Sequence, residues 1–242
     1  MKKLIITLFA LITSFTANAK EYNVNETKDC SQNAILMLCD LEGEPITGIV
    51  KRYYDNGNLK VEVNYKDGKL EGLGKVYYNN GNLKEEVNYK DNKLEGLSKF
   101  YYDNGNLRAE RNYKDGKPEG LSKAYYENGN LKAEENFKDD KEEGLGKGYY
   151  NNGNLKVEVN YKDGKEEGLS KTYYENGNLE AEENYKDGKL EGLSKAYYNN
   201  GNLKEEVNFK DGKAVSGYMY DIDGEKKEMT NAHLHNMTKN LK

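Results

Sequence analysis

Lysine and glutamate recur in this chain at one fixed spacing, which is the arrangement most suggestive of chemistry. Lys75 and Glu86 stand in the unit from 72 to 95, and the same two residue types return every 24 residues, seven times in all. The copies include Lys99 with Glu110 and Lys147 with Glu158. A positioned lysine and carboxylate can transfer protons. An active site is rarely needed seven times over, so the pattern favours cross-strand ion pairs.

Other candidates for catalysis or metal binding are few. His233 and His235 alternate in the segment 230–242, which we interpret as a solvated polar tail, although two histidines could clip a metal. The stretch from Asp221 to Gly224 resembles a calcium loop but lacks the ligand number and the distal glutamate of an EF-hand. Phosphate-binding glycine loops and serine nucleophile elbows are absent. We therefore expect no enzymatic activity, no cofactor and no metal site.

The two cysteines lie close together near the start of the chain. Cys30 and Cys39 flank the apolar run from Ala34 to Leu38. In an exported protein such a pair most often forms a disulfide, here within an N-terminal cap over residues 20–40. Two buried free thiols are the alternative. The absence of Cys-x-x-Cys spacing argues against a redox site.

The first 19 residues have the features of a secretory signal peptide. Lys2 and Lys3 precede an apolar run from Leu4 to Phe15, and Ala17-Asn18-Ala19 forms a small-residue cleavage site. About twelve apolar residues are too few to span a bilayer of roughly 30 Å, which disfavours a retained anchor. We therefore expect an exported product that is periplasmic, on the cell surface or secreted, with no transmembrane segment after cleavage.

Composition excludes some classes of partner and fold. The formal net charge is -5, and 33% of residues are charged with both signs interspersed, so a nucleic-acid-binding role is not expected. The mean hydropathy of -1.05 could indicate disorder. However, 22 tyrosines and regularly spaced turn residues are not typical of a disordered chain. An ordered protein with a thin core is expected.

A 24-residue unit organises most of the chain. The sequence Asn-Gly-Asn-Leu begins, without insertion or deletion, at Asn56, Asn80, Asn104, Asn128, Asn152, Asn176 and Asn200. Such regularity indicates one small module stacked in register. Each unit holds two turn signals, Asn80-Gly81 and a Lys-Asp-Gly-Lys type stretch, and its strands alternate apolar and polar residues with period two. The prediction is an all-β fold, an elongated antiparallel meander of hairpins with about two strands per repeat.

The array is predicted to extend over residues 41–229, with a degenerate half-unit over 41–50 and a closing hairpin over 217–229. Successive units should lie roughly 9.6 Å apart, and seven of them should form a twisted ribbon about 70 Å long. Each hairpin alone is marginal, so stability must come from contacts between neighbouring units.

The hairpin register follows from the turn that is assumed. A two-residue type I′ turn at Asn80-Gly81 places Lys75 opposite Glu86 and Tyr77 opposite Lys84, and likewise pairs Tyr78 with Leu83. One face then carries Tyr78, Leu83, Tyr89 and the residues at 74 and 76, and is the better candidate for burial. The other carries Leu73, Lys75, Tyr77, Lys84 and Glu86. A three-residue loop with a bulge would change these pairings.

Paired tyrosines give each unit one ring on each face. Packing explains them most simply, because aromatic cross-strand contacts hold thin sheets together. The functional alternative is a binding ladder that a long partner contacts several times, so that weak sites add through effective concentration. The candidate ladder consists of Tyr53, Tyr77, Tyr101, Tyr125, Tyr149, Tyr173 and Tyr197.

The pattern Gly-x-x-Lys-x-Tyr-Tyr-x-Asn-Gly-x-Leu-x-x-Glu-x-x-Tyr-x-x-Gly-Lys resembles the bacterial variant of the MORN repeat, from about 41 to 229. The resemblance implies an antiparallel hairpin array that acts as a scaffold or binding module. It also implies protein or membrane-surface association in some members and an antitoxin label or a surface-interaction role in others. Asn92 and Asp140 depart from it by replacing the turn glycine, and Ser216 replaces the glycine in phase with Gly72.

These features together predict a non-enzymatic, exported repeat protein that offers a multivalent surface to a protein or cell-surface partner. Two alternatives stay open. One is a periplasmic scaffold, or an antitoxin or immunity-type protein, that holds one protein partner. The other is a carbohydrate-binding or cell-wall-binding repeat protein, so a glycan ligand is possible, although the absence of Trp weakens this reading.

Overall fold

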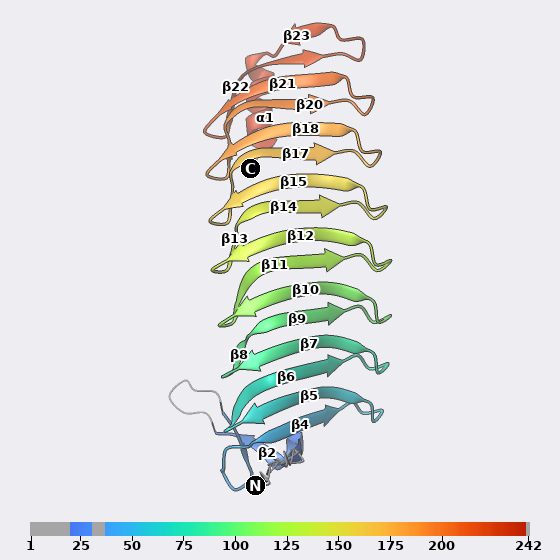
Figure 1. The fold of residues 1–242 in the computed structure, drawn as a ribbon. Helices are drawn as coiled ribbons and strands as arrows, with labels where there is room; N and C mark the ends of the chain where they lie inside the picture. The colour runs from blue at the N-terminus through green and yellow to red at the C-terminus, as the bar shows by residue number, and fades with distance from the viewer. Residues whose placement is uncertain (1–19, 31–36, 241–242) are drawn as a thin grey trace, which may run out of the picture.

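The computed structural model describes residues 20–30 and 37–240, and the predicted signal peptide lies outside them. One sheet of 21 strands, antiparallel except where its first strand pairs, dominates the molecule (Figure 1). Consecutive strands lie side by side, so the sheet is an elongated meander of stacked hairpins. The predicted all-β repeat array is therefore confirmed.

Each repeat contributes two long strands and one short one. The first strands are β4 (Gly48–Tyr53), β6 (Lys69–Tyr77), β9 (Gly96–Tyr101), β11 (Lys117–Tyr125), β14 (Gly144–Tyr149), β17 (Gly168–Tyr173) and β20 (Gly192–Tyr197). The second strands are β5 (Leu59–Lys66), β7 (Leu83–Lys90), β10 (Leu107–Lys114), β12 (Leu131–Lys138), β15 (Leu155–Lys162), β18 (Leu179–Lys186) and β21 (Leu203–Lys210). The short strands are β8 (Lys93–Leu94), β13 (Lys141–Glu142), β16 (Lys165–Glu166) and β19 (Lys189–Leu190). In β6 and β11 the short strand is continuous with the long strand that follows it. The prediction of about two strands per repeat did not include these short strands.

The tight two-residue turn lies at Asp-Gly and not at Asn-Gly. Asp67 and Gly68 have φ values of 50° and 77°, and the residues on either side of them pair with each other. Positive φ at both central residues is the geometry of a type I′ turn. At the Asn-Gly site only Gly81 has positive φ, at 90°. The loop there is closed by the Tyr78 N–H, which donates to the Asn82 carbonyl at 2.8 Å.

This longer loop changes the predicted register at one end of the hairpin. Lys75 does lie opposite Glu86, but a bulge follows and places Tyr77 opposite Leu83. The predicted pairs of Tyr77 with Lys84 and of Tyr78 with Leu83 are therefore wrong. Lys84 instead extends over the ring of Tyr78, with its Nζ atom 5.9 Å from the ring centroid.

The N-terminal cap closes the first edge of the sheet. It consists of β1 (Glu21–Asn23), the short 3-10 helix η1 (Val24–Glu26), β2 (Thr27–Asp29) and β3 (Leu38–Asp40). Strand β1 pairs in parallel with β4, and the Ile49 N–H donates to the Lys20 carbonyl at 2.8 Å. A Cβ atom at Gly48 would overlap that carbonyl, which explains the glycine. A disulfide joins Cys30 to Cys39, whose Cα atoms are 5.8 Å apart.

The C-terminal end is closed by a hairpin and a helix. Strands β22 (Lys213–Tyr220) and β23 (Lys226–Glu228) form the hairpin, and α1 (Asn231–Asn240) then folds back over the sheet. Leu234 and Met229 are buried against Leu190, Val207 and Phe209. The segment expected to be a solvated tail is therefore largely a packed helix. Within the described part of the chain, no helix is long and apolar enough to cross a bilayer.

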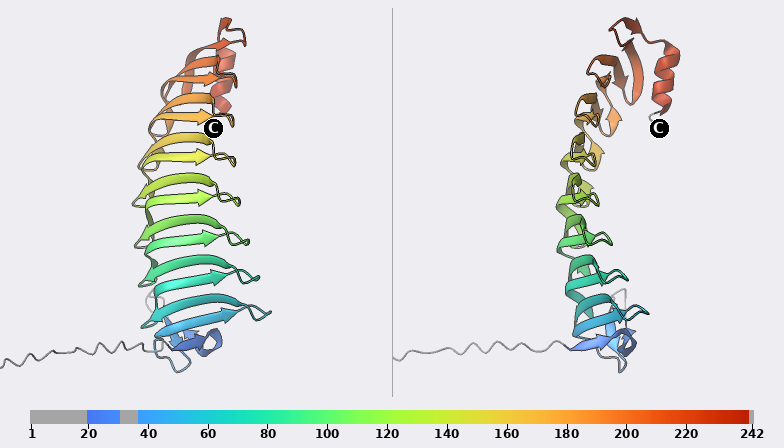
Figure 2. Two further views of the ribbon diagram at one scale, coloured as in Figure 1. Left: turned by 45° about the vertical axis from the view of Figure 1, so that its right-hand side comes forward. Right: turned by 90° about the vertical axis from the view of Figure 1, so that its right-hand side faces the viewer.

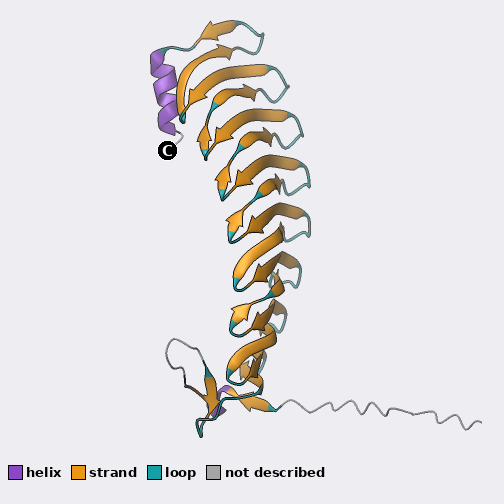
Figure 3. Ribbon diagram, turned by 60° about the vertical axis from the view of Figure 1, so that its left-hand side comes forward, coloured by secondary structure: helices purple, strands orange, loops and turns teal. Residues whose placement is uncertain are grey.

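The helix gives the sheet two distinct faces. Figures 2 and 3 show that the array curves toward the side on which α1 lies. We call that side the inner face and the opposite side the outer face. In the repeat from 72 to 95, Gly74, Val76, Glu85, Val87 and Tyr89 occupy the inner face, as their pairings and the lining of its grooves indicate.

Two turns allow a matched test of the backbone geometry. Asn92 and Asp140 replace the turn glycine at φ values of 68° and 70°. The Asn92 side chain accepts a hydrogen bond from the Leu70 N–H at 2.7 Å. Asp140 has no equivalent bond, because the matching residue is Pro118, which lacks an N–H. Asp140→Gly should therefore raise the free energy of unfolding by about 0.5–1 kcal/mol in urea denaturation.

Asn92→Gly serves as the comparison. It relieves the same backbone strain but leaves the Leu70 N–H without its acceptor, so its gain should be smaller than that of Asp140→Gly or replaced by a loss. Equal stabilisation by the two substitutions would contradict this account.

Candidate binding surfaces

A continuous row of alternating charge runs along the outer face. Lys75 lies opposite Glu86 within its own hairpin and opposite Glu62 of the preceding one. The same alternation continues from Lys51 to Glu206 and includes the predicted pairs Lys99 with Glu110 and Lys147 with Glu158. Nitrogen to oxygen distances are 3.8 Å for Lys75 with Glu86 and 3.5 Å for Lys147 with Glu158. Each half-exposed pair contributes little energy, but the row fixes the register.

The first tyrosine of each pair borders this row. The Tyr125 hydroxyl donates to Glu110 of the preceding repeat at 2.9 Å, and Tyr173 does the same to Glu158 at 3.2 Å. Partial burial, with Glu110 adding to it, raises the pKa of Tyr125. The hydroxyl groups therefore tie four members of the candidate ladder, Tyr125, Tyr149, Tyr173 and Tyr197, to the preceding repeat. The rings of the ladder stay half-exposed or, at Tyr53, exposed. Tyr220 of the closing hairpin extends the row through its bond to Glu206 at 2.8 Å.

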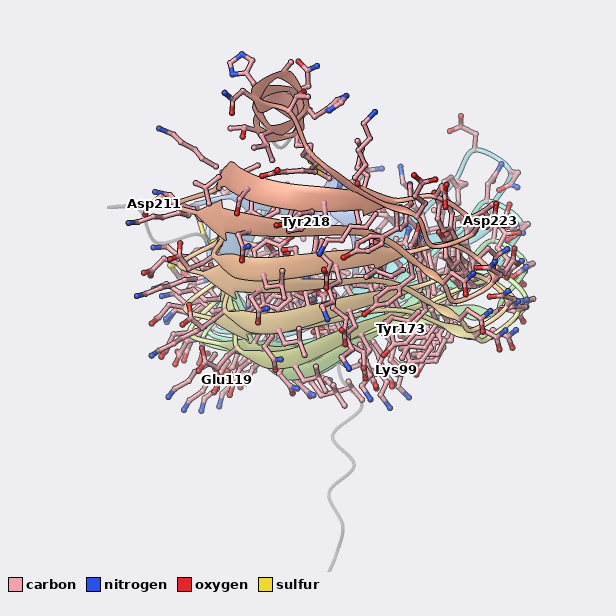
Figure 4. The ribbon with its side chains drawn as sticks, turned by 90° about the horizontal axis from the view of Figure 1, so that it is seen from above. Lys99, Glu119, Tyr173, Asp211, Tyr218 and Asp223 are labelled. Atoms are coloured by element: carbon pink, nitrogen blue, oxygen red, sulfur yellow. A yellow bond between two sulfur atoms is a disulfide. The ribbon has the colours of Figure 1, made fainter. Side chains whose placement is uncertain are left out.

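A row of exposed leucines lies on the same strands, two residues before the lysines. Their exposed fractions are nearly constant, at 40–42% for Leu97, Leu121, Leu145, Leu169 and Leu193. Leu73 was expected on this face, but an exposed apolar row was not predicted from the sequence. Viewed down the array, Lys99 and Tyr173 point away from α1 (Figure 4). The outer face therefore presents leucine, lysine and tyrosine in each repeat after the first, which has Ile49 at the leucine position.

The second tyrosine of each pair holds successive repeats together. The Tyr78 hydroxyl donates to the Tyr101 carbonyl of the next repeat at 2.8 Å, and the equivalent bond recurs down the array. Nearby, the Asn82 side chain donates to the Asp103 carbonyl at 2.7 Å. These residues form the loop edge of the sheet and have a structural role.

The opposite edge, formed by the Asp-Gly turns, carries a second set of contacts between repeats. Lys69 pairs with Asp91 at 3.0 Å and lowers the pKa of that carboxyl group. The Asp91 N–H donates to Glu71 at 3.0 Å. Figure 4 shows Glu119 and Asp211 of this edge on the side opposite Asp223 of the last loop. Most charged side chains at this edge therefore form contacts between successive repeats.

The inner face differs from repeat to repeat. Glycine or serine at the position of Gly74 leaves room for the Tyr89 ring, whose nearest atom would lie 3.0 Å from an added Cβ. Ser98 at the next such position is fully buried. Two shallow grooves of about 270 and 260 Å³ follow this face, one beside Met237 of α1 and one around Arg111 and Phe100.

Four glutamates gather on the central part of the inner face. We call Glu135, Glu142, Glu166 and Glu183 the acidic patch. All four are half-buried, and none forms an ion pair with another described residue. Burial raises the pKa of Glu166, and nearby Glu183 raises it further. These four glutamates belong to no repeated motif, so they were not predicted from the sequence.

Two of the residues considered for metal binding, His233 and Asp221, form local contacts instead. His233 and His235 lie on exposed positions of α1, and His233 Nδ1 is 3.0 Å from the Thr230 hydroxyl. The Asp221 carboxylate accepts backbone N–H groups of Asp223 and Glu225, as expected of a turn. Among residues 20–30 and 37–240, no three His, Cys, Asp or Glu side chains are grouped as metal ligands would be.

The raised pKa of Glu166 predicts a pH dependence. A carboxyl group with a higher pKa in the folded state favours folding when protonated, so its contribution is lost as pH rises from about 4.5 through the folded-state pKa. Glu166→Gln should therefore be more stable than the wild type at pH 7, and the difference should shrink toward pH 4.5. Urea denaturation at both pH values measures this.

Glu127→Gln is the control, because Glu127 is exposed at a loop tip and its side chain makes no hydrogen bond or ion pair in the described structure. It should leave stability within about 0.5 kcal/mol of the wild type at both pH values. If Glu166→Gln were less stable than the wild type at pH 7, the carboxylate would be favourable in the folded state and the prediction would be wrong.

Comparison with protein families gives seven consecutive matches to one repeat model, described as a MORN repeat variant. The matches cover residues 46–67, 70–91, 94–115, 118–139, 142–163, 166–187 and 190–211. A search of curated proteins finds no match. The repeat matches cover well over half of the chain and coincide with the hairpins described above. The chain belongs to the family of MORN-variant repeat proteins, and its repeats form a protein with a binding role.

Proposed function

We propose that this chain is an exported, non-enzymatic protein whose outer face binds a protein or cell-surface partner at several repeats at once. One observation carries the proposal. The outer face presents an exposed leucine with a half-exposed lysine and tyrosine in successive repeats, with no other part of the described chain over them. Exposed apolar rows of this length mark interaction surfaces more often than chance.

The spacing of the repeats suits multivalent contact. Equivalent residues recur after two strands, about 9.6 Å apart. A partner that engages one set of side chains is therefore held close to the next, and weak contacts add through effective concentration. Tyrosine suits such a surface, because it combines apolar area with a hydroxyl group at low entropic cost.

One feature of the sequence and one of the structure support export. The first 19 residues have the charge, apolar run and small-residue site of a signal peptide. The disulfide between Cys30 and Cys39 belongs to that cap, and such bonds persist in oxidising compartments.

A second candidate function is a scaffold that holds one protein partner. The inner face favours it, because its residues differ between repeats. The positions equivalent to Val87 carry Arg111, Glu135, Val159 and Glu183 in the next four repeats. A surface with a unique sequence at each level can recognise one partner in one register.

Deleting residues 118–165 tests multivalency, because it removes two whole units and keeps the remaining repeats in phase. The shortened protein should stay folded by circular dichroism. Its binding to intact cells of the producing organism, or to cultured host cells, should fall at least tenfold, because two sets of contacts are lost. The readout is titration of the fluorescently labelled protein.

A second variant distinguishes the effect of the leucine row on binding from the effect of the number of repeats. Leu121→Ser, Leu145→Ser and Leu169→Ser together keep all seven units but remove the centre of the leucine row. This variant should bind cells more weakly than the wild type. Unchanged affinity in both variants would contradict multivalent binding by the outer face.

Cell fractionation tests export. The mature chain should appear outside the cytoplasm, beginning at Lys20 by N-terminal sequencing, and deletion of residues 2–19 should retain it inside. Protease treatment of intact cells then separates a surface location, where the protein is digested, from a periplasmic one. A cytoplasmic pool of unprocessed protein would contradict the proposal.

A further inference from the structure

The inner face already accommodates one α-helix. Helix α1 lies along the long axis of the array, and its C-terminal end points toward the central repeats (Figures 2 and 3). Leu234 packs against Leu190, Val207 and Phe209, and Met237 borders the same cluster. The Thr238 hydroxyl accepts a bond from the Ala214 N–H at 3.0 Å. The array therefore shows how its inner face receives a helix.

The seat of α1 continues beyond the end of the helix. The groove of about 270 Å³ begins at Met237 and extends over Ala181 and Glu183. Farther along, Val159 is buried and Tyr161 and Tyr185 are half-buried, at positions equivalent to Val207 and Phe209 beneath α1. No part of the described chain covers this stretch in Figure 3. A second helix could thus follow α1 along the same strip.

Charge distinguishes this uncovered stretch from the seat of α1. Where the seat has Leu190 and Val207, the preceding repeat has Glu166 and Glu183. Tyr185 donates a hydrogen bond to Glu183 at 2.9 Å, which holds that carboxylate over the apolar strip. By strand alternation, the inner-face positions of residues 118–187 carry the acidic patch and no lysine or arginine. At the end of this stretch farther from α1, Arg111 of the preceding repeat extends its guanidinium group over the Phe137 ring, 5.2 Å from the ring centroid. A partner complementary to this strip would present apolar side chains flanked by positive charges, because the strip is apolar and its carboxylates form no ion pair with the described part of the chain.

The spacing of the repeats matches the pitch of a helix. Seven residues of an α-helix rise about 10.5 Å, and one repeat spans about 9.6 Å. A helix that lies along the array would therefore present one heptad to each repeat, with its apolar positions on the strip and its basic positions beside the glutamates. Three repeats would take a helix of about 20 residues.

We propose that the inner face of residues 118–187 binds a basic amphipathic α-helix of a protein partner, seated end to end with α1. The proposal rests on the second candidate function and names its site. It is independent of the outer face, so its failure would leave multivalent binding by the leucine and tyrosine rows untouched.

Two synthetic peptides of about 21 residues test the proposal. Both carry leucine at the a and d positions of three heptads, and the flanking positions are lysine in one and glutamate in the other. Fluorescence anisotropy with the full mature protein should show binding of the lysine peptide that weakens with added salt, together with a gain of helical circular dichroism. The glutamate peptide should bind at least tenfold more weakly.

The variant that tests the site replaces the acidic patch by Glu135→Gln, Glu142→Gln, Glu166→Gln and Glu183→Gln. It should weaken the lysine peptide at least tenfold. The matched control replaces Glu42, Glu44, Glu127 and Glu225 by glutamine, which changes the formal charge equally but at exposed positions away from the strip. This control should change affinity less than twofold, and circular dichroism verifies that both variants are folded.

Three results would overturn the proposal. One is equal weakening by the two variants, which would indicate non-specific attraction to an acidic protein. Another is the absence of binding by the lysine peptide up to millimolar concentration. The third is binding that requires removal of residues 231–242, which would assign the peptide to the seat of α1 instead.

Discussion

The structure depends on the fact that its sheet is a single layer for most of its length. A repeat has no opposing layer to pack against, so its partners are the repeats before and after it. The hydroxyl of the second tyrosine sets the distance between them, because it must reach a carbonyl of the next hairpin, as Tyr78 reaches Tyr101. One extra residue in a unit would move this hydroxyl and the neighbouring asparagine away from their acceptors. This constraint explains why the repeat length is 24 residues throughout, without insertion or deletion.

Much of the fold was predictable because turns and period are local properties. The hairpins and the pairing of Lys75 with Glu86 follow from alternation and turn residues. The turn type at Asn80-Gly81 does not, since that dipeptide suits both a two-residue turn and a longer loop with only the glycine at positive φ. Contacts with the next repeat select the longer loop. Helix α1 was missed because Leu234 and Met237 are too few to predict an amphipathic helix without the surface that buries them.

The candidate surfaces were predictable to different degrees for a related reason. Rows on the outer face repeat in the sequence, so the tyrosine ladder and the charge pairs were visible, whereas the leucines looked like ordinary strand residues until their exposure was known. The acidic patch has no repeated signature. Glu142 and Glu166 occupy the position that Leu190 fills beneath α1, and this contrast has meaning only once the strands are paired. The outer face carries residues that repeat in every unit, whereas the inner face carries residues that differ from unit to unit.

Both ends of the sheet are closed by the chain itself. Strand β1 covers the edge of β4, and β23, with the exposed sequence Lys226-Lys227-Glu228, is short and charged. A long bare edge would recruit strands from other copies and grow into filaments. Edges covered or charged in this way disfavour such growth, so the length of the sheet follows from the number of units that the gene encodes. Unequal crossing-over between the near-identical units could then lengthen or shorten the sheet by whole 24-residue units. The length of the molecule can therefore change in evolution while each hairpin keeps its fold.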